Sequence, residues 1–250
     1  MKITSTVPHH QAPFQAGTTA LSPWNRALDI ALCLLALPVL SLVVVTMAVF
    51  TRLVSPGPVF FRQERVGFRG TRFKIFKFRT MTVGADSTVH QNHLKQLISS
   101  NAPMVKLDSL HDARLIPAGW MLRASGIDEL PQLINVLRGE MSLVGPRPCI
   151  PSEFAQFLPW QRERANALPG LTGLWQVSGK NRTTFEQMIR LDIHYTRNPS
   201  LGLNLKIIAL TPWAMMVQFY DSRTGRKSPV FSAPAGTAPA RLIQLILPVQ

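Results

Sequence analysis

The sequence predicts the α/β fold class, in the form of a small membrane-associated domain that begins with a helix embedded in the membrane. Residues 30–51 carry no charged side chain, and a run of this length can enter a bilayer. Residues 59–81 are β-branched, aromatic and basic, which favours short strands. Residues 128–139 space their leucine and isoleucine side chains as a helix with one buried face does. A membrane helix, a pair of strands and a cytoplasmic helix are therefore expected in this order.

Composition and charge limit the class of partner. The chain of 250 residues has 27 Lys and Arg against 13 Asp and Glu, a net charge of +14, yet 46% of its residues are hydrophobic. A disordered nucleic-acid-binding arm combines high charge with few apolar residues, so this class is disfavoured. A membrane surface is the simplest partner that is both anionic and apolar. Cys33 and Cys149 form no CxxC pair, so neither a disulfide scaffold nor a thiolate zinc site is indicated.

The path of the membrane helix has two interpretations. Arg26 precedes the uncharged run and Arg52 is the first of several arginines after it, so the positive-inside rule favours a cytoplasmic C-terminal flank. Pro38 removes one helical hydrogen bond from the interior. The helix either spans the membrane with a kink or breaks and returns through the same face. Asp29 is expected in the headgroup zone, because a carboxylate is costly at greater depth.

Shifts in composition divide the chain into four segments. They are a disordered tail over 1–22, a re-entrant or spanning membrane helix over 23–54, a cytoplasmic domain over 55–221 and a second tail over 222–250.

The segment after the membrane helix is predicted to be a turn followed by two strands. Residues 55–58 read Ser-Pro-Gly-Pro, which favours a turn, and Gly67 and Gly70 are placed for a chain reversal. Lys77 and Arg79 are two apart and share one face of the second strand. Eight basic residues against one Glu lie in 52–82. Most of them are expected to contact lipid headgroups or solvent.

Residues 86–99 favour a polar helix. Residues 203–220 favour a further apolar helix, either interfacial or part of the core.

The segment 128–139 places two adjacent carboxylates at the start of its helix. Asp128 is a suitable N-cap, Glu129 suits the first turn, and Gly139 ends the helix. A helix N-terminus favours ionised carboxylates and offers N–H groups to a phosphate. An ionised carboxylate beside a phosphate suits nucleophilic attack on phosphorus or metal-bridged phosphate binding. Simple capping is the alternative explanation for both residues.

Basic residues follow in two further turns. Arg147 lies between Pro146 and Pro148, which fix the backbone on either side of it, so its guanidinium could be held ready for a phosphate. An exposed turn arginine without a role is the alternative. The segment 169–181 adds three glycines, a Trp and Lys180 in a loop–strand–loop pattern, without the spacing of a P-loop or dinucleotide-binding motif.

Taken together, these motifs resemble the bacterial sugar transferases, the monotopic polyprenyl-phosphate phosphoglycosyl transferases that initiate lipid-linked glycan and exopolysaccharide assembly. The resemblance covers about residues 24–220. It rests on five motifs in the family's order: SPGPVFFRQERVG at 55–67, KFRTM at 77–81, DELPQ at 128–132, NVLRGEMSLVGPRP at 135–148 and PGLTGLWQVSG at 169–179.

The resemblance implies a reaction. Asp128 and Glu129 match the family's catalytic dyad, so Asp128 is expected to attack the β-phosphate of a UDP-sugar, release UMP and hold the phosphosugar until a polyprenyl phosphate accepts it. Mg²⁺ is the expected cofactor, with Asp128 and Glu129 as its ligands. The residues expected around the substrate phosphates are Lys77, Arg79, Arg123, Arg147 and Lys180.

The resemblance also implies a location and partners. A re-entrant helix would hold the transferase domain on the cytoplasmic face of the bacterial inner membrane, in contact with membrane lipids. UDP-sugar and undecaprenyl phosphate are the expected substrates, nucleic acid is not expected to bind, and a homodimer is compatible with the resemblance. The competing interpretation is a membrane-anchored basic scaffold or nucleic-acid-binding protein without catalysis. The sequence does not predict which sugar is transferred.

Three positions depart from the family pattern. Ser41-Leu42 stands where many members have a Ser-Pro break, with Pro38 one turn earlier. Lys180 stands where an arginine is usual, which keeps the charge but loses bidentate geometry. Asn204 stands where an aspartate is frequent.

Overall fold

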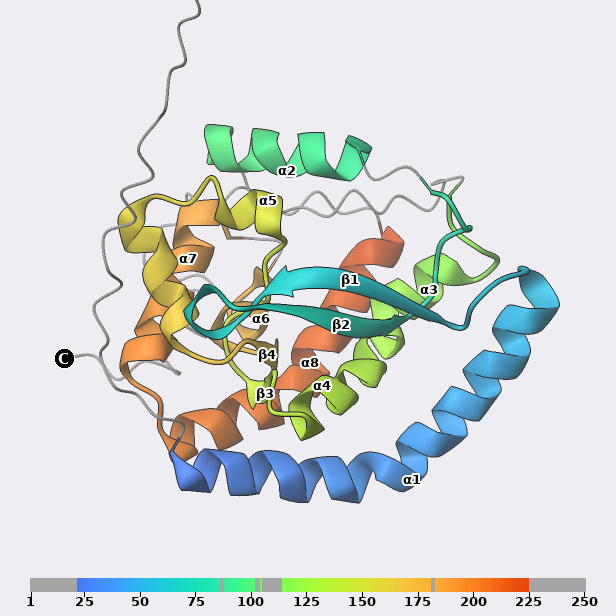
Figure 1. Cartoon of the computed structure of the whole chain (residues 1–250), viewed down its shortest axis with the longest axis horizontal. Helices are drawn as coiled ribbons and strands as arrows, with labels where there is room; N and C mark the ends of the chain where they lie inside the picture. Colours follow the sequence, from blue (N-terminus) through green and yellow to red (C-terminus); the bar gives the residue numbers. More distant parts are fainter. Residues whose placement is uncertain (1–21, 86–87, 102–103, 105–113, 181–182, 225–250) are drawn as a thin grey trace, which may run out of the picture.

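The computed structural model describes residues 22–85, 88–101, 104, 114–180 and 183–224. Helices and short strands alternate along the chain, around a β-hairpin at the centre of the molecule (Figure 1). Of the tail expected over 1–22, only Ser22 is among the described residues. Residues 225–250 of the second expected tail also lie outside them. The elements are α1 (Pro23–Val54), β1 (Phe60–Val66), η1 (Phe68–Gly70), β2 (Arg72–Phe78), α2 (Thr88–Ser100), α3 (Gly119–Ser125), η2 (Ile127–Gln132), α4 (Leu133–Leu137), β3 (Ser142–Val144), α5 (Pro151–Phe154), η3 (Pro159–Asn166), β4 (Gly170–Thr172), α6 (Leu174–Val177), α7 (Phe185–Arg197) and α8 (Leu201–Thr224).

Helix α1 is long and apolar enough to be embedded in a membrane, and among the described residues it is the one helix that is. It contains Pro38, and Figure 1 shows that it bends midway, so that its first half runs below the domain and its second half rises beside it. A contiguous apolar surface faces away from the domain, made of the exposed side chains of Ile30, Leu34, Leu35, Leu37, Val39, Leu42, Val45, Val49 and Leu53.

The N-terminal end of α1 is attached to the domain by polar side chains. Arg26 donates through both terminal nitrogens to the carbonyls of Val136 and Leu137 in α4, at 2.5 and 2.6 Å. Asp29 is 1% exposed and accepts hydrogen bonds from the backbone N–H of Leu143 at 2.9 Å and the hydroxyl of Ser142 at 3.1 Å. The expectation that Asp29 lies among lipid headgroups was wrong, because two donors of the protein offset the cost of burying its carboxyl group.

The predicted strand pair is confirmed. β1 and β2 form an antiparallel hairpin with Phe60 opposite Phe78 and Val66 opposite Arg72. The reversal between them is the short helix η1, and Gly70 has a φ of +80° there, a conformation that glycine adopts without strain. Asn135 attaches the hairpin to α4: its Oδ1 accepts from the N–H of Phe76 and its Nδ2 donates to the carbonyl of Lys74.

A second sheet joins two strands that are parallel. β3 pairs with β4 through Ser142 opposite Gly170 and Val144 opposite Thr172, and α5 and η3 form the connection. The two chains approach so closely after β3 that a Cβ atom on Gly145 would lie 2.2 Å from the carbonyl oxygen of Leu168. The loop–strand–loop expected at 169–181 contains the short helix α6 as well.

The helix expected over 128–139 begins differently from the prediction. Gly126, with a φ of +71°, turns the chain after α3, so the helical conformation begins at Ile127 and Asp128 is not the N-cap. The first turn is a 3₁₀ helix that contains Pro131, and the α-helical part is restricted to Leu133–Leu137. Gly139 ends the segment as expected, with a φ of +77°.

The remaining helices cover the sheets. α2 begins at Thr88, so the predicted helix over 86–99 is confirmed apart from its start, and Asp86 lies outside the described residues. Leu97 of α2 packs in one cluster with Phe157 and Phe185. α8 packs on the domain in part, since Ile207 is completely buried whereas Trp213, among others, is exposed. The interfacial alternative for 203–220 remains a prediction.

Asn204 of α8 is completely buried, and its hydrogen-bond partners suit an amide side chain. Its Oδ1 accepts from the hydroxyl of Tyr195 at 3.0 Å and its Nδ2 donates to the Oδ1 of Asn25 at 2.8 Å. An aspartate has no donor for Asn25, so the asparagine at this position fits its surroundings.

Candidate active site

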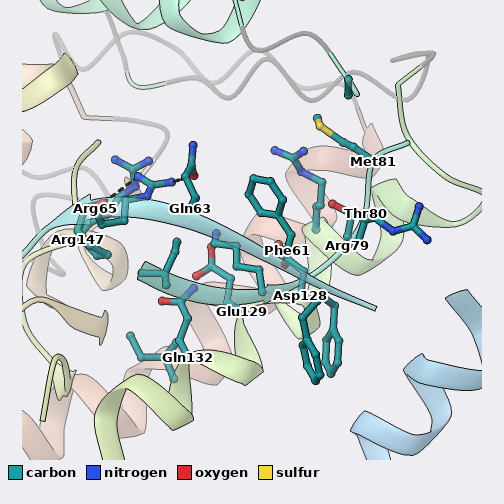
Figure 2. Close-up of a pocket in the computed structure, with 18 of the residues that line it drawn as sticks. Phe61, Gln63, Arg65, Arg79, Thr80, Met81, Asp128, Glu129, Gln132 and Arg147 are labelled. Atoms are coloured by element: carbon teal, nitrogen blue, oxygen red, sulfur yellow. Dashed lines mark hydrogen bonds and ion pairs between the residues drawn. The ribbon is translucent and has the colours of Figure 1, made fainter. Parts of the chain in front are cut away.

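A cavity of about 530 Å³ opens between the hairpin, η2 and the turn after β3. Figure 2 shows Asp128 and Glu129 below the hairpin, with Arg65 and Arg147 toward one end and Arg79 toward the other. Side chains from six separate parts of the sequence meet here. All seven predicted site residues line this cavity: Lys77, Arg79, Arg123, Asp128, Glu129, Arg147 and Lys180.

The carboxylate pair faces the hairpin. Asp128 is 7% exposed and Glu129 is partly exposed, both in the first turn of η2. The ammonium group of Lys77 on β2 contacts Glu129, with an Nζ–Oε1 distance of 2.7 Å. Lys77 lines the cavity together with Ile75, which lies two residues earlier on the same face of β2, and its charge lies beside the Glu129 carboxylate.

Two predicted phosphate-binding residues have other contacts within the protein. The guanidinium of Arg79 is buried and donates to the carbonyls of Pro58 and Ser55 and to the Ser55 hydroxyl, at 2.7 to 2.9 Å. Arg79 therefore fixes the turn between α1 and β1 at the cavity wall. Lys180 donates to the Oε1 of Gln218 in α8 at 2.8 Å. A phosphate role for either residue remains a prediction.

Arg65 is a cavity residue that the sequence reasoning missed. It lies on β1, is 7% exposed and donates to the carbonyl of Pro148 at 3.0 Å and to Gln63 at 2.7 Å. Burial and the neighbouring Arg147 guanidinium lower the pKa of Arg65 to about 10. The signal was present, because the alternation that places Lys77 on one face of β2 places Phe61, Gln63 and Arg65 on one face of β1.

Other lining residues had no predicted role, although several of them lie within the five motifs. Gln132 is buried in η2, and the Oε1 of Gln176 in α6 is a buried acceptor without a hydrogen-bond partner in the described structure. Part of the wall is apolar, from Phe61, Met81 and Leu97. The cavity thus combines cationic, amide and apolar surfaces.

The donor set limits which metal could bind. The described residues contain no group of three or more His, Cys, Asp and Glu side chains arranged for a metal ion. Two adjacent carboxylates suit Mg²⁺, which takes one or two protein oxygens and completes its octahedral shell with waters and substrate phosphates. A structural zinc site needs four protein ligands, which do not meet here.

A helix long and apolar enough for a membrane precedes a two-sheet domain, whose cavity is lined by two adjacent carboxylates and several basic side chains. The family model of the bacterial sugar transferases matches residues 21–218. The chain belongs to this family and is a sugar transferase.

Several curated proteins are similar to the chain. The UDP-glucose:undecaprenyl-phosphate glucose-1-phosphate transferase of Caulobacter vibrioides is 39% identical over 75% of this chain and 67% of its own length. The exopolysaccharide production protein ExoY of Sinorhizobium fredii is 34% identical over 75% of this chain and 83% of its own. The galactosyl transferase CpsE of Streptococcus agalactiae is 38% identical over 75% of this chain, but the match spans only 41% of CpsE.

Proposed function

We propose that the chain transfers a sugar 1-phosphate from a UDP-sugar to undecaprenyl phosphate, as the first step of exopolysaccharide or other lipid-linked glycan synthesis. The observation that carries this proposal is the convergence of Asp128, Glu129 and five basic side chains on one cavity. The name of the Caulobacter relative describes this kind of reaction, with glucose 1-phosphate as the transferred group. The apolar wall of the cavity and the apolar surface of α1 suit an acceptor with a lipid chain.

The chemistry is proposed to proceed in two displacements at one phosphorus atom. A carboxylate oxygen of Asp128 attacks the β-phosphorus of the UDP-sugar, a bond forms from that oxygen to phosphorus, and the bond to the bridging oxygen breaks to release UMP. The phosphate oxygen of undecaprenyl phosphate then attacks the same phosphorus, which regenerates the Asp128 carboxylate. Lys77 and Arg147 would offset the negative charge that accumulates on the phosphoryl oxygens.

Mg²⁺ fits the donor set as a further participant. Asp128 and Glu129 would hold the ion, and its positive charge would offset the negative charge of the pyrophosphate. Lys77 positions Glu129 through their 2.7 Å contact, so that the Glu129 carboxylate faces the cavity beside Asp128.

The attachment of α1 supports a re-entrant topology. The N-terminal end of the helix is hydrogen-bonded to α4 and β3 through Arg26 and Asp29, while its C-terminal end leads directly into β1. Both ends therefore contact the same domain, whereas a spanning helix would have its ends on opposite sides of the membrane. The bend of α1 suits a helix that enters and leaves the bilayer on one face (Figure 1). The positive-inside rule favours the cytoplasmic face for this attachment, and the membrane is proposed to be the inner membrane.

The reaction is tested by UMP release from a panel of UDP-sugars in detergent micelles with undecaprenyl phosphate and Mg²⁺. The parent protein should release UMP with at least one sugar, and Asp128→Asn should lower the rate by about 10³-fold or more, because the nucleophile is lost. Asp221→Asn in α8 is the matched control. Mass spectrometry of the parent with UDP-sugar alone should find a phosphosugar adduct on Asp128. Parental UMP release by Asp128→Asn would exclude Asp128 as the nucleophile.

The same variants test the competing function. A basic scaffold or nucleic-acid-binding protein would bind nucleic acid with a steep salt dependence. Its binding would not change in Asp128→Asn, and no UMP would be released.

The topology is tested by labelling introduced cysteines from each side of membrane vesicles. His10→Cys and Arg72→Cys should react from the cytoplasmic side only, in a background where Cys33 and Cys149 are replaced by serine. Labelling of the two positions from opposite sides would mean a spanning helix.

A further inference from the structure

Glu153 is an acidic side chain whose burial is energetically unfavourable. It lies in α5, five residues beyond Pro148, and it is completely buried. Among the residues that the structure describes, neither of its carboxylate oxygens accepts a hydrogen bond. A buried carboxylate normally accepts several hydrogen bonds, because its desolvation costs several kcal/mol. A purely structural role would therefore leave this residue poorly explained.

The surroundings of Glu153 are cationic. Its Oε2 lies 3.7 Å from a terminal nitrogen of Arg147, and its charge also acts on Arg65 and Arg164. Arg164 is already paired with the buried carboxyl group of Asp192. Among the acids that the structure describes, Glu153 is the fully buried one that lies beside Arg147, and its charge also favours the cationic form of Arg65.

Arg65 and Arg147 need such a charge, because they repel one another. Both guanidinium groups line the cavity and lie close together in Figure 2. Arg65 is held from its strand by the carbonyl of Pro148 and by Gln63. Arg147 has its backbone carbonyl fixed by a 2.8 Å hydrogen bond from Arg164. Two cations at one wall suit a phosphate group, whose oxygens accept from both.

We propose that Glu153 is a positioning residue, whose buried carboxylate holds the guanidinium groups of Arg65 and Arg147 together at one cavity wall as a joint phosphate site. This inference rests on the proposed function, since the phosphate would belong to one of its substrates. Glu153 does not face the substrate itself. It keeps the two cations from separating when the cavity is empty, so that the site is already formed when an anion arrives.

The test is a double-mutant cycle on kcat/KM for UMP release. Glu153→Gln keeps the shape of the side chain and removes its charge, and it should lower kcat/KM at least about tenfold. Arg147→Ala should lower it further. The double variant should lose less than the product of the two single losses, because part of the effect of Glu153 acts through Arg147 and the rest through Arg65. Glu153→Asp should regain part of the loss. Glu163→Gln, which removes an exposed carboxylate paired with Arg197, is the matched control and should keep parental kinetics.

Binding of UDP provides a readout that needs no turnover. UDP should raise the thermal unfolding temperature of the parent and of Glu163→Gln more than that of Glu153→Gln. If the parent binds UDP but releases no UMP, the proposed reaction is contradicted. The positioning role is then tested by the rise in unfolding temperature that UDP causes in each variant. If Glu153→Gln fails to fold, Glu153→Asp replaces it in the cycle, both alone and in combination with Arg147→Ala. Any of three results would overturn the proposal. The first is a Glu153→Gln variant with the parental kcat/KM and the parental UDP shift. The others are losses in kcat/KM that multiply in the double variant, and a parent that does not bind UDP.

Discussion

Lys77 and Glu129 form an ion pair across the cavity with an Nζ–Oε1 distance of 2.7 Å, although 52 residues separate them in the sequence. The contact joins β2 to η2 and orients the second carboxylate of the Asp128–Glu129 pair. Because both side chains are only partly exposed, the pair is less screened by solvent than a surface ion pair is. The hairpin and the 3₁₀ turn thus form one unit of the site.

Replacing Lys77 should impair the transfer. Lys77→Met removes the cation that orients Glu129, so UMP release should fall about 100-fold or more in kcat/KM. Lys74→Met on the same strand is the matched control, because Lys74 is exposed on the opposite face, and it should keep parental kinetics. Equal rates for the two variants would show that the charge of Lys77 has no part in the reaction.

Asn135 should be a major determinant of stability. Its side chain bonds to the Phe76 N–H, the Lys74 carbonyl and a carboxylate oxygen of Glu140, at 2.6 to 3.0 Å, and it is completely buried. Asn135→Ala leaves the Phe76 N–H without its acceptor, so the free energy of unfolding should fall by about 2–4 kcal/mol. Chemical unfolding in detergent micelles measures this change. Asn198→Ala, at an exposed helix end, should change it by less than about 1 kcal/mol.

Two glycine substitutions should have opposite effects. A Cβ atom on Gly145 would lie 2.2 Å from the Leu168 carbonyl oxygen, whereas one on Gly202 would meet nothing within 4 Å. Gly145→Ala must therefore separate β3 from β4, and the free energy of unfolding should fall by about 3 kcal/mol or more. Gly202→Ala lies in a helix and should leave it unchanged or raise it by up to about 1 kcal/mol. Similar unfolding midpoints for both variants would contradict the close approach of the two strands.

Asp192 should contribute a pH dependence to stability. Burial raises the pKa of Asp192 from 3.8 to about 6, although the Arg164 guanidinium acts in the opposite direction. Between these pH values the folded protein binds a proton that the unfolded chain releases. The contribution of this group is therefore complete below about pH 4 and is lost as the pH rises to about 6.

The measurement compares unfolding of the parent and Asp192→Asn from pH 4 to 7. The variant is less stable overall, because Arg164 loses the carboxyl group with which it is paired. The difference in free energy of unfolding between the two proteins should narrow as the pH rises from 4 to 6, by up to about 1.4 kcal/mol per pH unit. It should stay constant above pH 6. A constant difference over the whole range would show that the Asp192 pKa is not raised.

Local patterns predicted much of the fold. Alternation and turn glycines located the hairpin, and the uncharged run located α1, because these signals depend on neighbours in sequence. The start of the helix over 128–139 was wrong, since Gly126 turns the chain one residue before Ile127. Asp29 was also misplaced, because its donors, Ser142 and Leu143, lie more than a hundred residues further along the chain. Burial that depends on such distant contacts leaves no local pattern.

The sequence by itself nominated the residues for the chemistry and located a long apolar helix before them. Strand alternation and the resemblance of five motifs were sufficient to nominate seven residues that line one cavity. Only the tertiary structure decided how these side chains are held. The ion pair of Lys77 with Glu129, the use of Arg79 to fix Ser55, and the buried Glu153 beside Arg147 all join separate elements. The physical reason is that charge pairing acts through space, so the partner of a cation is set by how the elements pack and not by its neighbours in the chain.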